Sequence, residues 1–478
     1  MAGGFVDQTA AGDPRVSQLE GALDKIGTTA SHKKILLLVL IGVLFDSFEQ
    51  NTIGIAGPML RQHWGLSVAD IGLLNTITFG AAATGRLLSG YIADRHGRRV
   101  MLGINLLLFT LGSAVCALAP NYAVLAVGRA IVGFGLGGEI SVAVTMLAEF
   151  CSSRFRGTAV GLVNVGAGGL GNFLAPAFGL LVFYFFPGPD GWRWLFGCLA
   201  VPALLIVFYR RFIPETPRYL LSAGKVGEAN RVLSILASGR LASTGLRVHP
   251  YLAEDGPGGA APTAGRARLS EIFRGPFARR TVPVAVAIWM SYGAQITVLT
   301  LLPTILVAQG HTLTASLLFT MVIQSGSFLG AVAASAVGYY LPRRLALTTG
   351  AVLACLSALA LGFAATGVGA VLVLGAIFQF FVLFLNTTIW IYAPELYPTR
   401  IRAFGVAFIL ATGTAAGALT PILSGRLFDA FGFGGVFALI AAMYAVFAAS
   451  IRFSPETYGR SLEDVDAPAA SAAAGAGT

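Results

Sequence analysis

Two carboxylates, Asp46 and Glu49, interrupt an apolar stretch near the start of this 478-residue chain. Because they are three residues apart, they fall on adjacent parts of one helix face. Burial favours the neutral form of a carboxyl group, so such a group can bind and release a proton as its surroundings change. Arg129, in a later glycine-rich stretch, can stabilise a charged carboxylate in one conformation and release it in another. We expect these residues and Glu139 to carry proton coupling; the alternative is that they form static buried ion pairs.

The composition is that of a membrane protein. The chain is 56% hydrophobic and 11% charged, whereas soluble domains carry about 25% charged residues. About twelve apolar runs approach the 20 residues that a bilayer-crossing helix needs. Backbone groups in lipid must be hydrogen-bonded internally, so these runs are expected to be helices. The predicted spans are roughly 35–57, 68–92, 100–119, 122–148, 158–186, 192–213, 281–308, 312–340, 345–366, 368–393, 404–428 and 432–452.

The connections between these spans alternate in charge. One set carries most of the lysines and arginines, including Lys33, Lys34 and the run Arg95 to Arg99, and the other set carries few. By the positive-inside rule the basic set is cytoplasmic, so both termini are predicted to be inside a multi-pass protein of the cell membrane. Because the net charge of +10 is carried by these loops, we expect no nucleic-acid partner.

The second half of the chain repeats the first. Arg98 and Arg99 recur as Arg343 and Arg344, and Glu149 recurs as Glu395, each about 245 residues later. A Pro-Glu-Thr triplet also recurs, at 214–216 and 455–457. Such a repeat predicts two structural halves. The predicted organisation is an N-terminal tail (1–34), a six-helix bundle (35–213), a linker with short helices (214–280), a second six-helix bundle (281–452) and a C-terminal tail (453–478).

Several motifs resemble those of the major facilitator superfamily. The loop at 90–99, Gly-Tyr-Ile-Ala-Asp-Arg-His-Gly-Arg-Arg, is similar to the loop between the second and third helices of that family. The glycines at 128, 133, 135 and 137 around Arg129 resemble its fourth-helix motif, and the segment 455–463 is similar to the sugar-porter tail. The resemblance covers about residues 35–464. It implies an all-α membrane fold of twelve helices in two six-helix bundles, alternating access, and a role for Arg129 in proton relay.

Within this superfamily the motifs resemble the branch of sugar porters, metabolite:proton symporters and organic-ion carriers of the synaptic-vesicle-protein and niacin-carrier type. Sugar porters carry a glutamine pair in the seventh helix, but Ser291-Tyr292 stands at that place here. Tyr292-Gly293 before Leu302-Pro303 looks more like the organic-ion and niacin-carrier branch. The resemblance therefore favours an organic solute other than a sugar.

Polar and aromatic residues within the spans are candidates for substrate binding. Amides and aromatic rings are the groups that orient a small solute in a cavity, and an arginine could bind an anion. Each of them could instead form a helix–helix hydrogen bond, or, for the arginine, extend to the membrane interface. The candidates are Asn75, Arg86, Asn164, Tyr292, Gln295, Gln324, Gln379, Asn386 and Trp390.

Charged residues at the cytoplasmic ends of the spans are candidates for gating. Ion pairs at such positions can close the inward side and break when it opens. The pairs expected from sequence are Glu149 with Arg156 and Glu395 with Arg402. The gating candidates are Asp94, Arg95, Arg98, Arg99, Glu149, Arg156, Glu395 and Arg402.

These features predict a secondary active transporter that moves a small organic solute together with protons. The expected solute is an organic acid, and the narrower expectation is an aromatic one. The alternatives are a sugar or polyol symporter, proton-coupled efflux of organic cations or drugs, and a non-transporting membrane sensor. Because the sequence has no phosphate loop, triad spacing or metal cluster, we expect neither an enzyme nor a cofactor or metal. The expected partners are the solute, protons and the lipid bilayer, and we expect a monomer.

Overall fold

The computed structural model describes residues 14–201, 212–241, 246–253, 269–337, 340–397 and 399–458, and the regular secondary structure in these residues is all helical. The elements are α1 (Pro14–Ile26), α2 (Ala30–Trp64), α3 (Val68–His96), α4 (Arg98–Ala117), α5 (Tyr122–Phe150), α6 (Ser153–Asn164), η2 (Val165–Gly171), α7 (Asn172–Phe185), α8 (Gly191–Cys198), α10 (Pro217–Ser222), α11 (Val226–Ser238), η3 (Leu269–Phe273), α12 (Gly275–Ala308), α13 (Leu313–Val337), α14 (Arg343–Leu359), η4 (Ala360–Ala364), α15 (Val368–Glu395) and α16 (Thr399–Ile451).

Nine helical segments within these residues are long and apolar enough to cross a membrane. The last of them covers two predicted spans, because α16 runs through 404–428 and 432–452 with a kink at Gly432, where φ is 65°. The predicted span 192–213 lies partly outside the described residues, and α3 is not among the nine. The all-helical membrane fold is therefore established, whereas the number twelve and the cytoplasmic termini stay predictions.

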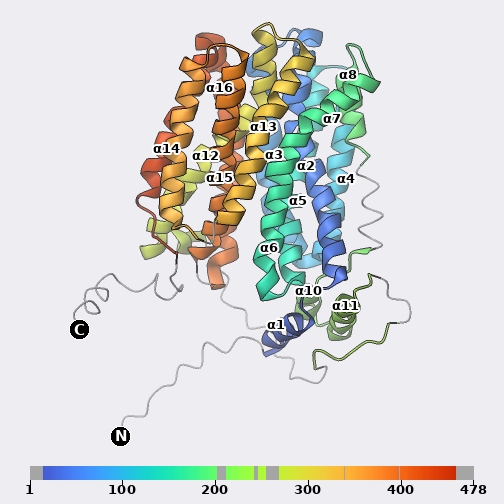
Figure 1. Ribbon diagram of the computed structural model, residues 1–478. Coiled ribbons are helices and arrows are strands. Elements are labelled where there is room, and N and C mark those ends of the chain that lie inside the picture. The colour runs from blue at the N-terminus through green and yellow to red at the C-terminus, as the bar shows by residue number, and fades with distance from the viewer. Residues whose placement is uncertain are drawn as a thin grey trace, which may run out of the picture.

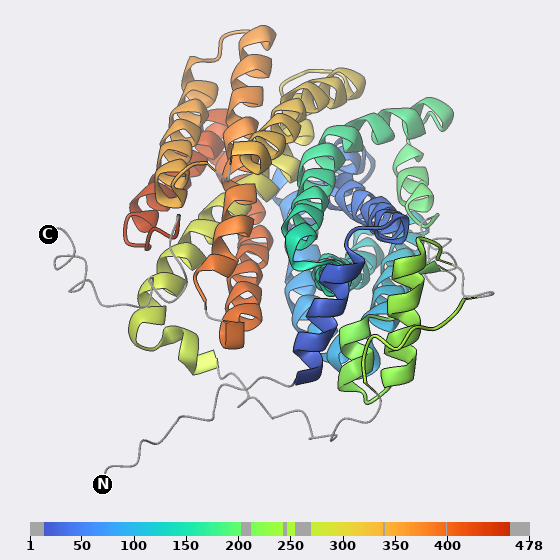
Figure 2. The ribbon, with the colours of Figure 1, turned by 60° about the horizontal axis from the view of Figure 1, so that its bottom comes forward.

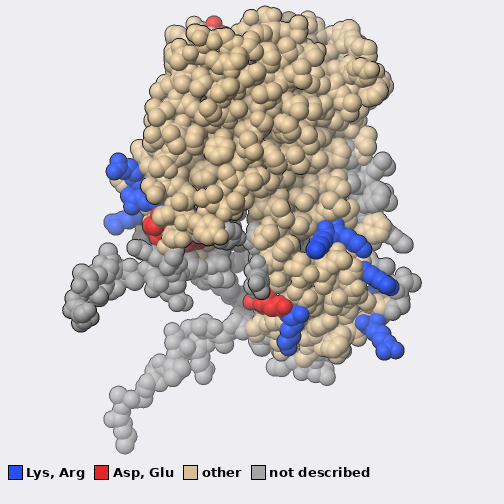
Figure 3. Space-filling model, in the orientation of Figure 1, with Lys and Arg blue, Asp and Glu red and all other residues tan. Residues whose placement is uncertain are grey.

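The helices form two groups that follow the two halves of the sequence. Figure 1 shows α2 to α8 on one side and α12 to α16 on the other, and Figure 2 shows the same separation from below. On the face drawn in Figure 3, lysines and arginines gather around the lower end, and the body above is almost free of charge. An uncharged belt with basic residues at one end is the surface expected of a membrane-spanning bundle.

The two halves touch most closely at the end of the bundle opposite this basic rim. Gly54 in α2 lies against the backbone of Leu299 in α12, and Gly72 in α3 lies against the backbone of Pro421 in α16. Neither glycine leaves room for a Cβ atom, so the helix backbones approach directly. The hydroxyl of Thr76 also donates to the carbonyl of Ala418. The halves are thus closed against each other at this end.

Short helices pack beneath the N-terminal half. Figure 1 shows α1, α10 and α11 together below α5 and α6. Thr29, at the start of α2, donates its hydroxyl to the carbonyl of Leu236 in α11 (2.6 Å), and Arg218 forms an ion pair with Glu20 of α1 (2.8 Å). These contacts tie the segments 14–26 and 217–238 to the base of one half.

Candidate transport site

A small cavity of about 60 Å³ lies between the two halves. A cavity needs about 10–15 Å³ of such space to hold one water molecule, whereas pockets for organic ligands measure about 300–1,000 Å³. In this conformation the space is therefore large enough for water and too small for an organic solute. The N-terminal half contributes Ser47, Gln50, Ile140, Val144, Val163, Asn164, Ala167, Gly168 and Asn172, and the C-terminal half contributes Tyr292, Gln295, Leu383, Asn386 and Trp390.

Five of the substrate candidates named from sequence line this cavity: Asn164, Tyr292, Gln295, Asn386 and Trp390. Asn386 donates to the side-chain oxygen of Gln295 and accepts from the hydroxyl of Ser291 (2.7 Å). This chain of bonds orients the two amides at the wall of the cavity.

The remaining candidates are not among the lining residues. Gln324 and Gln379 are buried and bond to each other at 2.9 Å, as expected for a contact between α13 and α15. Asn75 is buried in α3, and neither its amide nitrogen nor its oxygen has a hydrogen-bond partner. The sequence also did not single out Ser47, Gln50 and Asn172, which belong to the lining.

A buried ion pair joins α2 to α5 beside the cavity. Nη1 of Arg129 contacts Oε1 of Glu49, and both side chains are completely buried. Nε of Arg129 donates to the hydroxyl of Thr78 at 3.0 Å, and its guanidinium carbon lies 5.9 Å from the centre of the Phe196 ring. Ser113 donates to the second oxygen of Glu49 at 3.4 Å. The charge of Glu49 is therefore matched by Arg129 and receives one further hydrogen bond from Ser113, whereas Thr78 contacts the arginine.

The other two acids named from sequence face each other. The carboxyl groups of Asp46 and Glu139 lie within hydrogen-bonding range of each other, and both side chains are 1% exposed. One oxygen of each, Oδ2 of Asp46 and Oε2 of Glu139, has no hydrogen-bond partner. Two buried carboxyl groups in contact cannot both be ionised without strong repulsion, so such a pair can hold a shared proton.

Asp46 and Glu49 each precede, in the sequence, a residue that lines the cavity. Asp46 and Glu49 point toward α5, while their neighbours Ser47 and Gln50 line the cavity. Because all four residues belong to α2, a rotation or shift of this helix on protonation of the acids would also move the cavity wall.

Arg86 links the two halves through bonds to backbone carbonyls. Its Nε donates to the carbonyl of Gly137 in α5 at 3.2 Å, and its Nη1 donates to the carbonyl of Leu410 in α16 at 3.1 Å. Within the described part of the chain no carboxylate forms an ion pair with it. The guanidinium of Arg86 also interacts electrostatically with the hydroxyl of Tyr292, which lines the cavity. The guanidinium is thus a cation near the cavity that has no ion-pair partner among the described residues.

A π-helical segment, η2, forms part of the cavity wall. It runs through the glycine-rich sequence Val165–Gly171, and its Ala167 and Gly168 line the space. The hydroxyl of Ser47 donates to the carbonyl of Ala167 at 2.9 Å. Single π-helical turns are frequent at functional sites, because the widened turn displaces backbone groups from the regular pattern.

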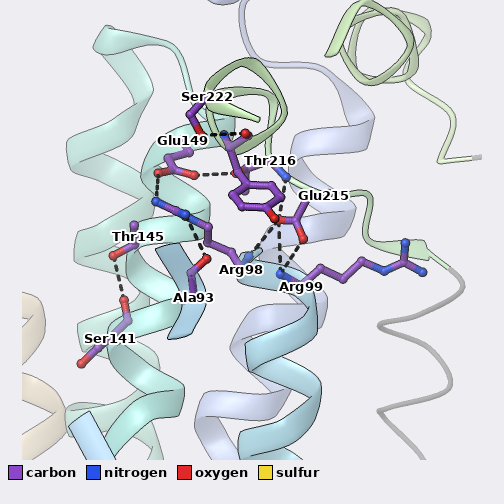
Figure 4. Close-up of polar contacts among 10 residues, drawn as sticks. Ala93, Arg98, Arg99, Ser141, Thr145, Glu149, Glu215, Thr216 and Ser222 are labelled. Atoms are coloured by element: carbon purple, nitrogen blue, oxygen red, sulfur yellow. Dashed lines mark hydrogen bonds and ion pairs between the residues drawn. The ribbon is translucent and has the colours of Figure 1, made fainter. Parts of the chain in front are cut away.

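Charged residues form a network at the basic end of the N-terminal half, shown in Figure 4. Arg98 pairs with Glu149 of α5 at 3.2 Å, and Glu149 accepts from the hydroxyl of Thr216 at 2.6 Å. Glu215 accepts from the backbone N–H groups of Arg98 (2.9 Å) and Arg99. Burial raises the pKa of Glu215, and these backbone donors oppose that shift. We call Arg98, Glu149, Glu215 and Thr216 the N-half clamp.

The C-terminal half contains the same network, as the sequence repeat predicts. Arg343 contacts both carboxylate oxygens of Glu395, at 3.2 and 3.0 Å. Glu395 accepts from the hydroxyl of Thr457 at 2.6 Å, and Glu456 accepts from the backbone N–H of Arg343 at 2.9 Å. We call these four residues the C-half clamp. Each clamp joins elements of one half only.

The gating candidates are therefore placed as follows. Glu149 and Glu395 pair with Arg98 and Arg343, whereas the side chains of Asp94, Arg156 and Arg402 lie outside the described residues. The exposed Arg95 donates to the hydroxyl of Tyr91 at 3.1 Å. Arg99 contributes its backbone N–H to Glu215.

Two helical halves around a buried polar cavity, with clamped helix ends, define a membrane transport protein of the major facilitator superfamily. The family model described as "Sugar (and other) transporter" matches residues 26–468. The chain therefore belongs to this family of transporters, which confirms the resemblance noted in the sequence. It is a multi-pass protein of the plasma membrane.

Relatives and solved structures agree with this assignment. The niacin transporter NiaP of Acinetobacter baylyi is 31% identical over 444 residues, which cover 91% of this chain and 96% of that protein. The gallate transporter of Pseudomonas putida is 32% identical over 411 residues, covering 82% and 85%. A crystal structure of a D-xylose-proton symporter shares the fold with a TM-score of 0.70, at 19% identity, covering 89% of this chain and 99% of that one.

Proposed function

We propose that this protein is a proton-coupled symporter of a small aromatic carboxylate. The observation that carries the proposal is the buried group of three carboxyls and one arginine beside the central cavity. Arg129 matches the charge of Glu49, and a proton shared by Asp46 and Glu139 removes the repulsion between two ionised carboxyl groups. A site that holds a proton in one state and loses it in another can couple transport to the proton gradient.

Two observations support a carboxylate as the solute. Arg86 is a cation near the cavity whose hydrogen bonds go to backbone carbonyls, so a bound carboxylate could replace them with a charge-assisted pair. Two of the relatives are named for niacin and gallate, and both compounds are aromatic carboxylic acids. Tyr292 and Trp390 would flank such a ring, and the amides of Gln295, Asn386 and Asn164 would orient its substituents.

We further propose that the protein works by alternating access. The halves are closed at the end where Gly54 and Gly72 meet the opposite half, and the cavity between them measures only about 60 Å³. Binding of the solute then requires the halves to separate at one end while the other stays closed. The residues that would couple this motion to protons are Asp46, Glu49, Arg129 and Glu139.

The test is a thermal-shift screen of the purified protein, followed by uptake into proteoliposomes. Nicotinate and gallate, present at 100 times their dissociation constant, should stabilise the folded protein by about 2.7 kcal/mol. An inward proton gradient should drive their accumulation, and a protonophore should abolish it. Arg86→Gln should weaken carboxylate binding about tenfold or more, because it removes a charged hydrogen-bond donor. Stabilisation by xylose or glucose, or by an organic cation, in place of the carboxylates would contradict the proposal.

We propose that the two clamps hold the helix ends of each half together so that each half moves as a unit. Glu149→Gln should then lower the free energy of unfolding by about 1–3 kcal/mol, because Arg98 loses its charged partner in a largely buried place. The measurement is the melting temperature in detergent. The control is Glu228→Gln, whose pair with Lys225 is more than half exposed and contributes little. Equal melting temperatures for the two variants would show that the clamp does not stabilise the half.

A further inference from the structure

A groove on the outer surface of the C-terminal half has basic residues at one end and apolar residues along its length, as a phospholipid has a charged headgroup and apolar chains. It measures about 620 Å³ and lies between α14 and the end of α16. Its lining residues are Arg344, Thr348 and Val352 from one side, and Ala448, Ala449, Arg452 and Phe453 from the other. Both arginines and Phe453 are at the basic end of the bundle, and Val352, Ala448 and Ala449 lie deeper along the two helices.

Helical spacing explains how the two stripes face each other. Arg344, Thr348 and Val352 are four residues apart, so they lie on one face of α14. Ala448 lies in the last turn of α16, and Arg452 follows directly after the helix ends at Ile451. From Arg344 to Val352 the helix rises about 12 Å, comparable to the upper part of an acyl chain.

The two guanidinium groups are available to a ligand. Arg344 and Arg452 are exposed, and in the described residues no carboxylate forms an ion pair with either side chain. The nearby Glu456 is held by the backbone N–H groups of Arg343 and Arg344. Figure 3 shows a group of basic side chains at the lower edge of the C-terminal half, next to the uncharged belt. Cations placed where the belt ends meet the phosphate groups of the surrounding lipid leaflet.

We propose that this groove binds an anionic phospholipid, with its phosphate on Arg344 and Arg452 and an acyl chain along Val352, Ala448 and Ala449. Thr348 supplies a hydroxyl that can donate to the headgroup. The positive charge at the polar end selects an anionic headgroup over a zwitterionic one. The apolar floor distinguishes a lipid from a free phosphate ion, because only a lipid covers it.

Native mass spectrometry of the delipidated full-length protein tests this site. Dioleoylphosphatidylglycerol should bind more tightly than dioleoylphosphatidylcholine. The double variant Arg344→Ala/Arg452→Ala should bind the anionic lipid about thirtyfold more weakly, because each basic residue near the surface contributes about a factor of five. The matched control is Arg231→Ala/Arg240→Ala, which removes the same charge from exposed positions of the α11 segment. Equal binding of the two lipids, or equal effects of the two double variants, would overturn the proposal.

A second variant tests the apolar part of the site. Ala449 is exposed, so Ala449→Trp fills the groove without disturbing the core. It should weaken binding of the dioleoyl lipid and leave the arginines in place. If Ala449→Trp has no effect and inorganic phosphate displaces the lipid at equal concentration, the arginines form a simple anion site and the lipid proposal is wrong.

Discussion

Asp46→Asn should abolish proton-driven accumulation of the solute while leaving counterflow exchange across the membrane. The side chain keeps its size but can no longer share a proton with Glu139, so the pair loses the charge change that couples transport to the gradient. A pH difference of one unit supplies about 1.36 kcal/mol per proton, which supports roughly tenfold accumulation in the wild-type protein. In the variant the internal and external concentrations should become equal.

Two controls make this result interpretable. Asp190→Asn makes the same chemical change at an exposed position and should accumulate solute normally. Glu139→Gln tests whether the proton belongs to the pair: loss of accumulation in both variants indicates a shared site, and loss in Asp46→Asn alone places the proton on Asp46. Normal accumulation by Asp46→Asn at wild-type surface expression would exclude this residue as the coupling site.

The general organisation could be predicted from the sequence because it depends on local and periodic signals. Apolar runs of sufficient length predict membrane helices, and the repetition of Arg98 and Glu149 as Arg343 and Glu395 predicts two related halves. The structure shows equivalent clamps at these positions. Glu149 and Glu395 pair with Arg98 and Arg343. The expected pairs of these acids with Arg156 and Arg402 stay predictions, because the side chains of both arginines lie outside the described residues.

The contacts within the site could not be predicted, because they join residues far apart in the chain. The sequence indicated that Asp46, Glu49, Arg129 and Glu139 act in one site, but not which of the acids forms the ion pair with Arg129. That choice depends on how α2 and α5 are placed side by side. Likewise, amides in membrane helices look alike in sequence, yet Asn386 lines the cavity whereas Gln379 bonds to Gln324. The π-helical turn of η2 has no clear sequence signal beyond its glycines.

The largest loss of stability should come from Arg129→Met. This change leaves the carboxylate of Glu49 completely buried without its cation, and the remaining donor, Ser113, is at 3.4 Å. Breaking a buried ion pair by removing one partner costs about 3–5 kcal/mol, because the other charge remains uncompensated. The measurement is thermal unfolding of the purified protein in detergent. Arg218→Met, which breaks an exposed pair with Glu20, should change stability by less than about 1 kcal/mol.

The double variant Glu49→Gln/Arg129→Met separates charge from packing. If the cost arises from the unpaired carboxylate, removing that charge as well should restore most of the lost stability, since a neutral pair can replace a buried ion pair at little cost. If the double variant is as unstable as Arg129→Met, the arginine acts through its contacts with Thr78 and Phe196. The static ion-pair interpretation and the coupling interpretation also differ here. A static pair predicts that a stable double variant still accumulates solute, whereas a coupling pair predicts a folded protein that only exchanges it.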